Sequence, residues 1–236
     1  MFRVVIPARW QSSRFPGKPL ASIEGRPMIT HVYERARASR AAAVIVATDD
    51  ERIAAAARAA GADVCMTAAS HASGTDRIAE VARARDFRGE DIIVNLQGDE
   101  PRMPAALIDQ VAAVLEAHPA AAISTLATAV ATREQYLDPN VVKVVTDREG
   151  RALYFSRAPI PHDRDTGAHE ARRHVGLYAY RVGALLRLAS LPPTRLEQLE
   201  KLEQLRALEH GMEIRVADAV QPPGPDVNTP DDLRRL

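Results

Sequence analysis

The pattern of apolar segments predicts an α/β fold, with a mostly parallel central sheet flanked by helices. Short apolar runs at 4–6 and 44–48 have the length of buried strands, and helical periodicity is present at 26–36 and 51–60. Strands that alternate with helices favour a parallel sheet with right-handed crossovers. A second observation is that this alternation stops after residue 140. We therefore expect a smaller antiparallel lobe beside the main sheet.

The next elements continue the alternation. A third strand is expected at 63–67 and a helix at 78–85. The nearly continuous apolar run at 91–96 is typical of a strand near the centre of a parallel sheet. An amphipathic helix at 104–118 and a strand at 121–130 complete the main sheet.

The antiparallel lobe is predicted from a hairpin signal. Strand patterns at 141–146 and 152–156 flank the turn sequence Asp-Arg-Glu-Gly. We place this lobe as an insertion at about 130–190 within a single domain that spans residues 1–236. The lobe could carry a substrate site, a dimer surface or both.

Leucines at helical spacing predict one amphipathic helix at 195–210, whose apolar stripe includes Leu199. The residues Glu197, Glu200 and Glu203 would then form its solvated face.

Composition limits the classes of function. Lys plus Arg and Asp plus Glu both number 31, so no overall charge attracts nucleic acid or an anionic membrane. The single cysteine, Cys65, excludes an internal disulfide and a cysteine-based zinc site. No apolar run approaches the ~18 residues of a membrane span, and the start lacks a signal-peptide pattern. We expect a cytoplasmic protein without a nucleic-acid or membrane partner.

The segment VVIPARWQSSRFPGKPL at 4–20 carries the strongest chemical signal. Its strand leads into a loop with Arg9, Arg14 and Lys18. Arginines offer forked donors, lysine offers a compact charge, and Gly17 allows the backbone to approach a ligand, which together suit a triphosphate. The alternative is an ordinary solvated loop, because the segment matches neither common glycine-rich phosphate motif.

The predicted strand at 91–96 ends in Gln97-Gly98-Asp99. A carboxylate at the carboxyl end of a central strand, beside a triphosphate, is a natural ligand for Mg²⁺. This ion prefers oxygen ligands and usually takes only one or two from the protein. The alternative is a simple turn at Gly98-Asp99.

Several polar residues also have purely structural explanations. Ser73 or Thr75 could cap the helix that follows, and Asp49 or Asp50 could begin the helix at 51–60. Tyr178 shares one face of a predicted strand with His174, Gly176 and Tyr180. A polar and aromatic face of this kind suits a sugar, although tyrosines are common in strands.

Several ordered motifs resemble those of the CMP-sugar synthetases, and most closely those of the 3-deoxy-manno-octulosonate (Kdo) cytidylyltransferases. The similarity runs from about residue 4 to residue 233. Its motifs are IPARWQSSRFPGKPL at 6–20, SGTDR at 73–77, QGDEP at 97–101, FSRAPIPHDRD at 155–165, RHVGLYAYR at 173–181 and LEQLEKLEQLR at 196–206. The resemblance implies a Rossmann-like fold of the nucleotide-diphospho-sugar transferase type.

The resemblance also implies an activity, a cofactor and a set of residues. The implied reaction transfers CMP from CTP to Kdo and releases pyrophosphate, for lipopolysaccharide biosynthesis, with Mg²⁺ as cofactor and a homodimer as the assembly. Arg9, Lys18 and Asp99 are implied as catalytic, with Asp99 also binding the metal. The implied substrate-binding residues are Arg14, Ser73, Gly74, Arg77, Gln97, Arg157, Arg164, His174, Tyr178, Glu203 and Gln204.

The sequence departs from the family pattern near its end. The family motif G-V-D-T-P-E-D-L supplies a second metal ligand from its Asp, and the aligned residue here is Asn228. An Asn carbonyl can bind Mg²⁺ without contributing charge, and Asp226 could compensate. Alternative functions are another CMP-sugar synthetase, acting on 8-amino-Kdo or sialate, and a non-catalytic nucleotide-binding paralogue.

Overall fold

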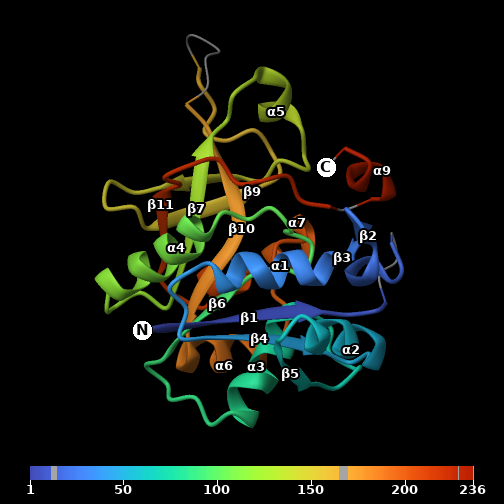
Figure 1. The fold of residues 1–236 in the computed structure, drawn as a ribbon. Coiled ribbons are helices and arrows are strands. Elements are labelled where there is room, and N and C mark those ends of the chain that lie inside the picture. Colours follow the sequence, from blue (N-terminus) through green and yellow to red (C-terminus); the bar gives the residue numbers. More distant parts are fainter. Residues whose placement is uncertain (12–14, 165–169, 228, 236) are drawn as a thin grey trace.

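The central sheet confirms the predicted α/β class. The computed structural model describes residues 1–11, 15–164, 170–227 and 229–235. Within these residues the main path of the sheet has the order β11-β7-β10-β6-β1-β4-β5, and β8 and β9 extend it from β10 (Figure 1). The strands are β1 (Phe2–Ala8), β4 (Ala43–Thr48), β5 (Asp63–Met66), β6 (Ile92–Asn95), β7 (Ile123–Ala129), β8 (Lys143–Thr146), β9 (Ala152–Ser156), β10 (Arg172–Arg181) and β11 (Ile214–Asp218).

The direction of the strands places most of their carboxyl ends at one edge. β1 pairs in parallel with β4 and β6, and β4 pairs in parallel with β5. β7 and β11 are also parallel to each other. β10 lies between β6 and β7 and runs antiparallel to both. Loops that follow β1 and β6 are therefore neighbours, as the sequence predicted.

Helices cover both faces of the sheet, because alternate residues of each buried strand face opposite sides. Val4 and Ile6 of β1 pack in the same apolar cluster as residues of α1 and α4. Val5 packs in a second cluster with residues of α3 and α6. The helices are α1 (Met28–Arg37), α2 (Glu51–Ala59), α3 (Gly74–Ala84), α4 (Ala105–Ala117), α5 (Arg133–Leu137), α6 (Val182–Ser190), α7 (Arg195–Glu200), α8 (Gln204–Glu209) and α9 (Pro230–Leu233). The short elements are the 3₁₀ turn η1 (Lys18–Leu20) and the strands β2 (Ser22–Ile23) and β3 (Arg26–Pro27).

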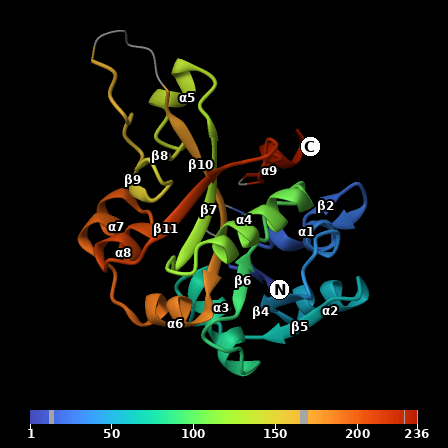
Figure 2. The same cartoon turned by 90° about the vertical axis from the view of Figure 1, so that its left-hand side faces the viewer.

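The predicted antiparallel hairpin is present as β8 and β9, which pair with each other. Gly150 makes the turn with a φ of 80°, a left-handed conformation that favours glycine. β8 also pairs with the start of β10, so the hairpin joins the main sheet edge to edge. Figure 2 shows β8, β9 and α5 at the end of the molecule from which β10 enters the sheet. The limits of a separate inserted lobe stay a prediction.

The prediction of one continuous helix at 195–210 is wrong. α7 ends at Glu200. The next residue, Lys201, has a φ of 54° in the left-handed region, and α8 begins at Gln204. Leu199 consequently leaves the apolar stripe and is 67% exposed. The predicted solvated face is also wrong for two glutamates, because Glu197 pairs with Arg206 and Glu200 accepts hydrogen bonds from residues of β9 and its following loop.

Across the part of the chain that the structure describes, no helix is both long enough and apolar enough to cross a bilayer.

Candidate active site

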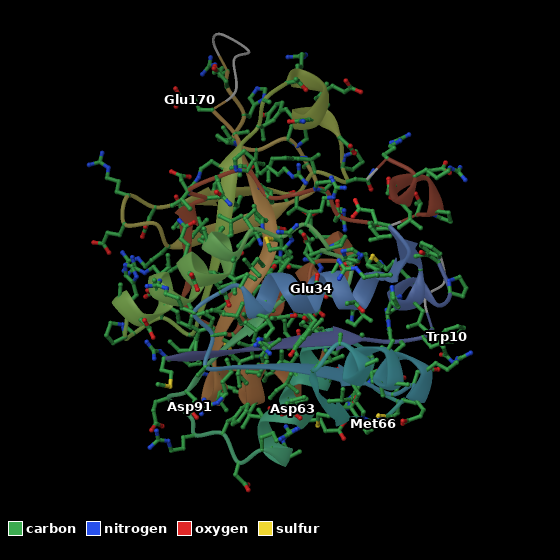
Figure 3. The ribbon with its side chains drawn as sticks, viewed as in Figure 1. Trp10, Glu34, Asp63, Met66, Asp91 and Glu170 are labelled. Atoms are coloured by element: carbon green, nitrogen blue, oxygen red, sulfur yellow. The ribbon has the colours of Figure 1, made fainter. Side chains whose placement is uncertain are left out.

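A cavity of about 210 Å³ lies where β1 and β6 end side by side. It brings together seven of the predicted residues. They are Arg9, Lys18, Ser73, Gly74, Arg77, Gln97 and Asp99. Figure 3 shows Trp10, which follows β1, and Asp91, which precedes β6, at opposite ends of the parallel strands, and the cavity lies at the end near Trp10.

Gly98 allows the two strand ends to approach this closely. A Cβ atom at position 98 would lie 2.9 Å from the backbone oxygen of Pro7. Because that oxygen belongs to the backbone of the neighbouring strand, it cannot move aside cheaply. Gly98 therefore has a packing role that the sequence interpretation did not include.

The loop after β1 is fixed by its only tryptophan. Gly17 has a φ of 70°, and its amide donates to the carbonyl of Trp10 at 3.0 Å. The guanidinium carbon of Arg52 lies 3.3 Å from the centre of the Trp10 ring. Arg52 is itself held by two side-chain hydrogen bonds to Asp50, which caps α2 as predicted. The loop is thereby tied to α2. Arg14 lies outside the described residues.

Lys18 connects three segments that meet at the cavity. Its ammonium donates to Asp99 Oδ2 at 2.6 Å and to the Val227 carbonyl at 3.0 Å. The Val227 amide donates in turn to the Asp99 carbonyl at 3.0 Å. The segment that precedes α9 is therefore held against the end of β6.

The oxygens around Lys18 fit a hard cation. The Asp99 carboxylate and the Val227 carbonyl already converge on one positive charge. Burial, with the charges of Asp99 and Asp226, raises the pKa of Glu100 to about 8, so at neutral pH Glu100 is mostly protonated and the acidic charge here is that of Asp99 and Asp226. The described residues contain no group of three or more His, Cys, Asp or Glu side chains placed to hold a metal ion. Mg²⁺ fits nonetheless, because it usually takes one or two protein ligands.

Asn228, which aligns with the second metal ligand of the family, lies outside the described residues. Its role and that of Asp226 stay predictions.

Arg77 is buried beneath the cavity and already has partners. It is 2% exposed, donates to the Thr67 hydroxyl, and lies 3.3 Å from Asp49 Oδ2. Asp49 therefore serves as the counter-ion of Arg77, while Asp50 caps the helix. Ser73 caps α3 in a reciprocal capping box with Asp76, so its structural explanation is confirmed.

A second cavity, of about 120 Å³, adjoins the first, and Gln97 lines both. Tyr178, Glu203 and Gln204 line it as well, so three predicted acceptor residues come together here. Three further polar residues were not predicted as site residues. They are Thr75, Asn95 and Tyr180. The one local signal was Asn95, a polar residue that ends an otherwise apolar strand.

Three of the predicted substrate-binding residues that the structure describes line neither cavity. His174 lies behind Tyr178, with ring centres 5.2 Å apart, and its Nε2 lies 3.0 Å from the Thr125 hydroxyl. Burial, with the charge of Arg173, lowers the pKa of His174 to about 3. Arg157 donates to backbone carbonyls of Glu200 and Pro139, and Arg164 is exposed.

The fold and the two joined cavities define an α/β enzyme that binds a nucleotide at the carboxyl ends of parallel strands. The model of the cytidylyltransferase family matches residues 3–214, and the chain belongs to this family. The predicted family resemblance is thus confirmed.

Named relatives align over the whole chain. The chain is 53% identical to the 3-deoxy-manno-octulosonate cytidylyltransferase of Thioalkalivibrio sulfidiphilus over 242 residues, covering 100% of this chain and 97% of that protein. It is 55% identical to the protein of the same name from Halorhodospira halophila, covering 100% and 95%.

Two solved structures of cytidylyltransferases are also similar to this chain. A CMP:2-keto-3-deoxy-manno-octonic acid synthetase in complex with CTP has a TM-score of 0.93 and 43% identity, covering 100% of this chain and 96% of that one. A cytidylyltransferase from Leptospira borgpetersenii, at 16% identity and a TM-score of 0.58, covers 96% and 77% and shares the fold.

Proposed function

We propose that the chain transfers CMP from CTP to Kdo, forming CMP-Kdo and pyrophosphate. The observation that carries this proposal is identity above 50% along the whole chain to proteins named for this activity. The CTP in the similar solved structure supports the nucleotide. The activity would serve lipopolysaccharide biosynthesis.

The reaction is an in-line displacement. The anomeric hydroxyl oxygen of Kdo forms a bond to the α-phosphorus of CTP while the bond from that phosphorus to the pyrophosphate oxygen breaks. The sugar hydroxyl loses its proton. The protein's main contributions are positioning and neutralisation of charge.

Arg9 and Lys18 would hold the triphosphate, because both line the first cavity. Without a ligand, Lys18 is paired with Asp99 at 2.6 Å. A phosphate oxygen would compete for the Lys18 ammonium and so expose the Asp99 carboxylate to a metal ion. Arg77 would contribute positive charge from below, held in place by Asp49.

Asp99 would hold Mg²⁺, with the Val227 carbonyl, Asp226 or Asn228 completing the site. When bound, this ion would neutralise phosphate charge and lower the pKa of the attacking hydroxyl. Tyr178, Glu203 and Gln204 would bind the acceptor sugar from the second cavity.

The test is pyrophosphate release from CTP by purified protein, with Kdo and Mg²⁺ each present or omitted. We expect pyrophosphate release only when CTP, Kdo and Mg²⁺ are all present. Release with 8-amino-Kdo or sialate, but not with Kdo, would assign a different acceptor. CTP binding without release from any of these acids would refute the catalytic assignment.

Two expectations accompany this function. We infer a cytoplasmic location, where CTP is made, and a homodimer. Sedimentation of the purified chain would test the dimer, and a monomer at micromolar concentration would refute it.

A further inference from the structure

The segment 219–227, which we call the arm, follows β11 and lies against the turn that comes after β6. A Cβ atom added to Gly224 would overlap the backbone oxygen of Arg102, and it would lie 2.6 Å from Arg102 Cβ and 2.9 Å from the Arg102 carbonyl carbon. Among the glycines that the structure describes, none would bring an added Cβ atom closer to another backbone. Contacts this short are not found in close-packed proteins, so only a residue without a side chain fits at this position.

The need for glycine at this position comes from the contact and not from the backbone conformation. Gly224 is not among the residues with a positive φ. Pro225 follows it, and a residue that precedes proline is restricted to extended conformations that every amino acid can adopt. Alanine is therefore compatible with the backbone at position 224, and its methyl group alone creates the conflict.

The turn that contacts Gly224 is fixed on both sides of Arg102. Pro101 is buried and Met103 is 1% exposed. The Met103 amide also donates to the Glu100 carbonyl at 3.2 Å. Because these neighbours hold the Arg102 backbone in place, an added methyl group would displace the arm and not the turn.

The arm is anchored at both ends. The Val220 amide donates to Gln110 Oε1 at 3.0 Å, and Gln110 Nε2 donates to the Asp218 carbonyl at 2.7 Å. At the other end, Val227 is completely buried and its amide donates to the Asp99 carbonyl at 3.0 Å. Three prolines between these anchors restrict the backbone. A displacement at position 224 is therefore passed on to Val227, three residues away.

Val227 lies where the arm meets the candidate cation site. Its carbonyl accepts from the Lys18 ammonium at 3.0 Å, and the same ammonium donates to Asp99 Oδ2 at 2.6 Å. A displaced arm would separate the oxygens of Val227 and Asp226 from the Asp99 carboxylate. Mg²⁺ requires nearly ideal octahedral geometry, so such a shift would weaken its binding.

We propose that Gly224 is a positioning residue, whose contact with Arg102 seats the arm beside Asp99 and so completes the cation site. This inference rests on the proposed function, in which the arm supplies oxygen ligands to Mg²⁺. Gly224 lines neither substrate cavity, and it acts through the position of Val227.

The first test is hydrogen exchange of the metal-free protein, measured by mass spectrometry for native protein and G224A. The Val227 amide is the reporter, because it is bonded to the Asp99 carbonyl and the three prolines of the arm carry no amide hydrogen. Loss of this bond predicts exchange at least about tenfold faster in G224A.

The second test is pyrophosphate release from CTP and Kdo as a function of Mg²⁺ concentration. In G224A, the Mg²⁺ concentration for half-maximal release should rise at least about tenfold, and saturating Mg²⁺ should return kcat to within about threefold of the native value. Calorimetry in EDTA should give a CTP affinity within about threefold of native, because Arg9 and Lys18 come from β1 and the loop that follows it. This pattern separates a positioning residue from a metal ligand, whose loss saturating Mg²⁺ does not restore.

The matched control is G89A. Gly89 also lacks a positive φ, and a Cβ atom there would meet no atom closer than 4.0 Å. It lies in the loop that precedes β6, at the other end of that strand from the arm. G89A should leave the exchange of Val227, the Mg²⁺ requirement and CTP binding unchanged.

Three results would overturn this inference alone. Native-like exchange of Val227 in G224A would show that the seated arm accommodates a methyl group. Faster exchange with an unchanged Mg²⁺ requirement would show that the arm does not complete the cation site. A loss of CTP affinity in EDTA as large as the change in the Mg²⁺ requirement would show general damage to the site.

A different result would overturn the proposed function. Native protein without Kdo-dependent pyrophosphate release would remove that function and, with it, the role of the arm at a cation site. The exchange of Val227 in the metal-free protein would still decide whether Gly224 seats the arm.

Discussion

The ion pair between Glu197 and Arg206 should be a major source of stability for the break between α7 and α8. Arg206 donates from Nε and Nη2 to the two Glu197 carboxylate oxygens at 2.8 and 2.5 Å. The two side chains are 9% and 13% exposed. Replacing Glu197 by Gln would remove the carboxylate that is bonded to the buried guanidinium and leave only Glu203, at 3.9 Å, as a counter-ion.

The expected cost follows from this burial. Breaking a buried ion pair costs roughly 3–5 kcal/mol, and we expect the low end, about 3 kcal/mol, because Arg206 also donates to backbone carbonyls. For a chain of this size that loss corresponds to a fall in melting temperature of about 6–12 °C. Thermal and urea unfolding at pH 7 would measure it.

The pH dependence of the free energy of unfolding gives a second test of this ion pair. Burial raises the pKa of Glu197, but its hydrogen bonds with Arg206 and with the Thr194 amide outweigh burial, so the pKa lies below the usual glutamate value of 4.5. A carboxyl group whose pKa is lower in the folded state than in the unfolded state stabilises the fold at pH above the unfolded-state pKa. This stabilisation is lost as the pH falls through the folded-state pKa. The difference between native protein and E197Q should therefore shrink as pH falls below 4.5.

An exposed pair provides the control. Arg58 and Glu51 lie 2.5 Å apart, but their side chains are 48% and 69% exposed. We expect E51Q to cost at most about 0.5 kcal/mol. A loss below about 1 kcal/mol in E197Q, or one equal to that of E51Q, would refute the reasoning.

Three further predictions concern the site. D99N should lower turnover at saturating Mg²⁺ by at least about 100-fold while melting near the native temperature, and near-native turnover would exclude Asp99 as a metal ligand. His174 has a folded pKa of about 3, below its unfolded value, so the native fold should lose stability as pH falls below 6.5. Between pH 6.5 and pH 5, the free energy of unfolding measured in urea should fall by up to about 2 kcal/mol less in H174Q than in native protein. Equal falls would show that His174 becomes protonated in the fold. G98A would place a Cβ atom 2.9 Å from the Pro7 oxygen, so it should lower kcat/KM at least about tenfold, and native kinetics would show that the strand ends can separate.

The elements that could be predicted are those whose signal is local. The apolar runs of β1, β4 and β6, and the residues that follow them, place Arg9 and Asp99 at one edge of a parallel sheet. β10 could be predicted as a strand, but its place between β6 and β7 could not, because pairing depends on residues far apart in the chain. The break at Lys201 has neither Gly nor Pro to mark it, and a lysine adopts the left-handed conformation there.

The residues of the site also divide into those that a local pattern predicts and those that it does not. The residues of the first cavity lie in motifs that follow strands, so they could be identified from the sequence and its resemblance to a family. Thr75 and Tyr180 could not, because their local patterns indicate a helix start and an ordinary strand. Both residues line the second cavity, and the hydrogen bond from Thr75 to Glu203 joins segments that only the folded chain brings together.

The position of Trp10 makes the loop after β1 observable by fluorescence. It is the single tryptophan of the chain, and it lies between Gly17 and the guanidinium of Arg52. Its emission in the unmodified protein therefore comes from this loop alone. CTP that draws Lys18 away from Asp99 would shift the neighbouring Gly17 against the indole ring. A stopped-flow record of that emission would time nucleotide binding beside this loop, with no label attached.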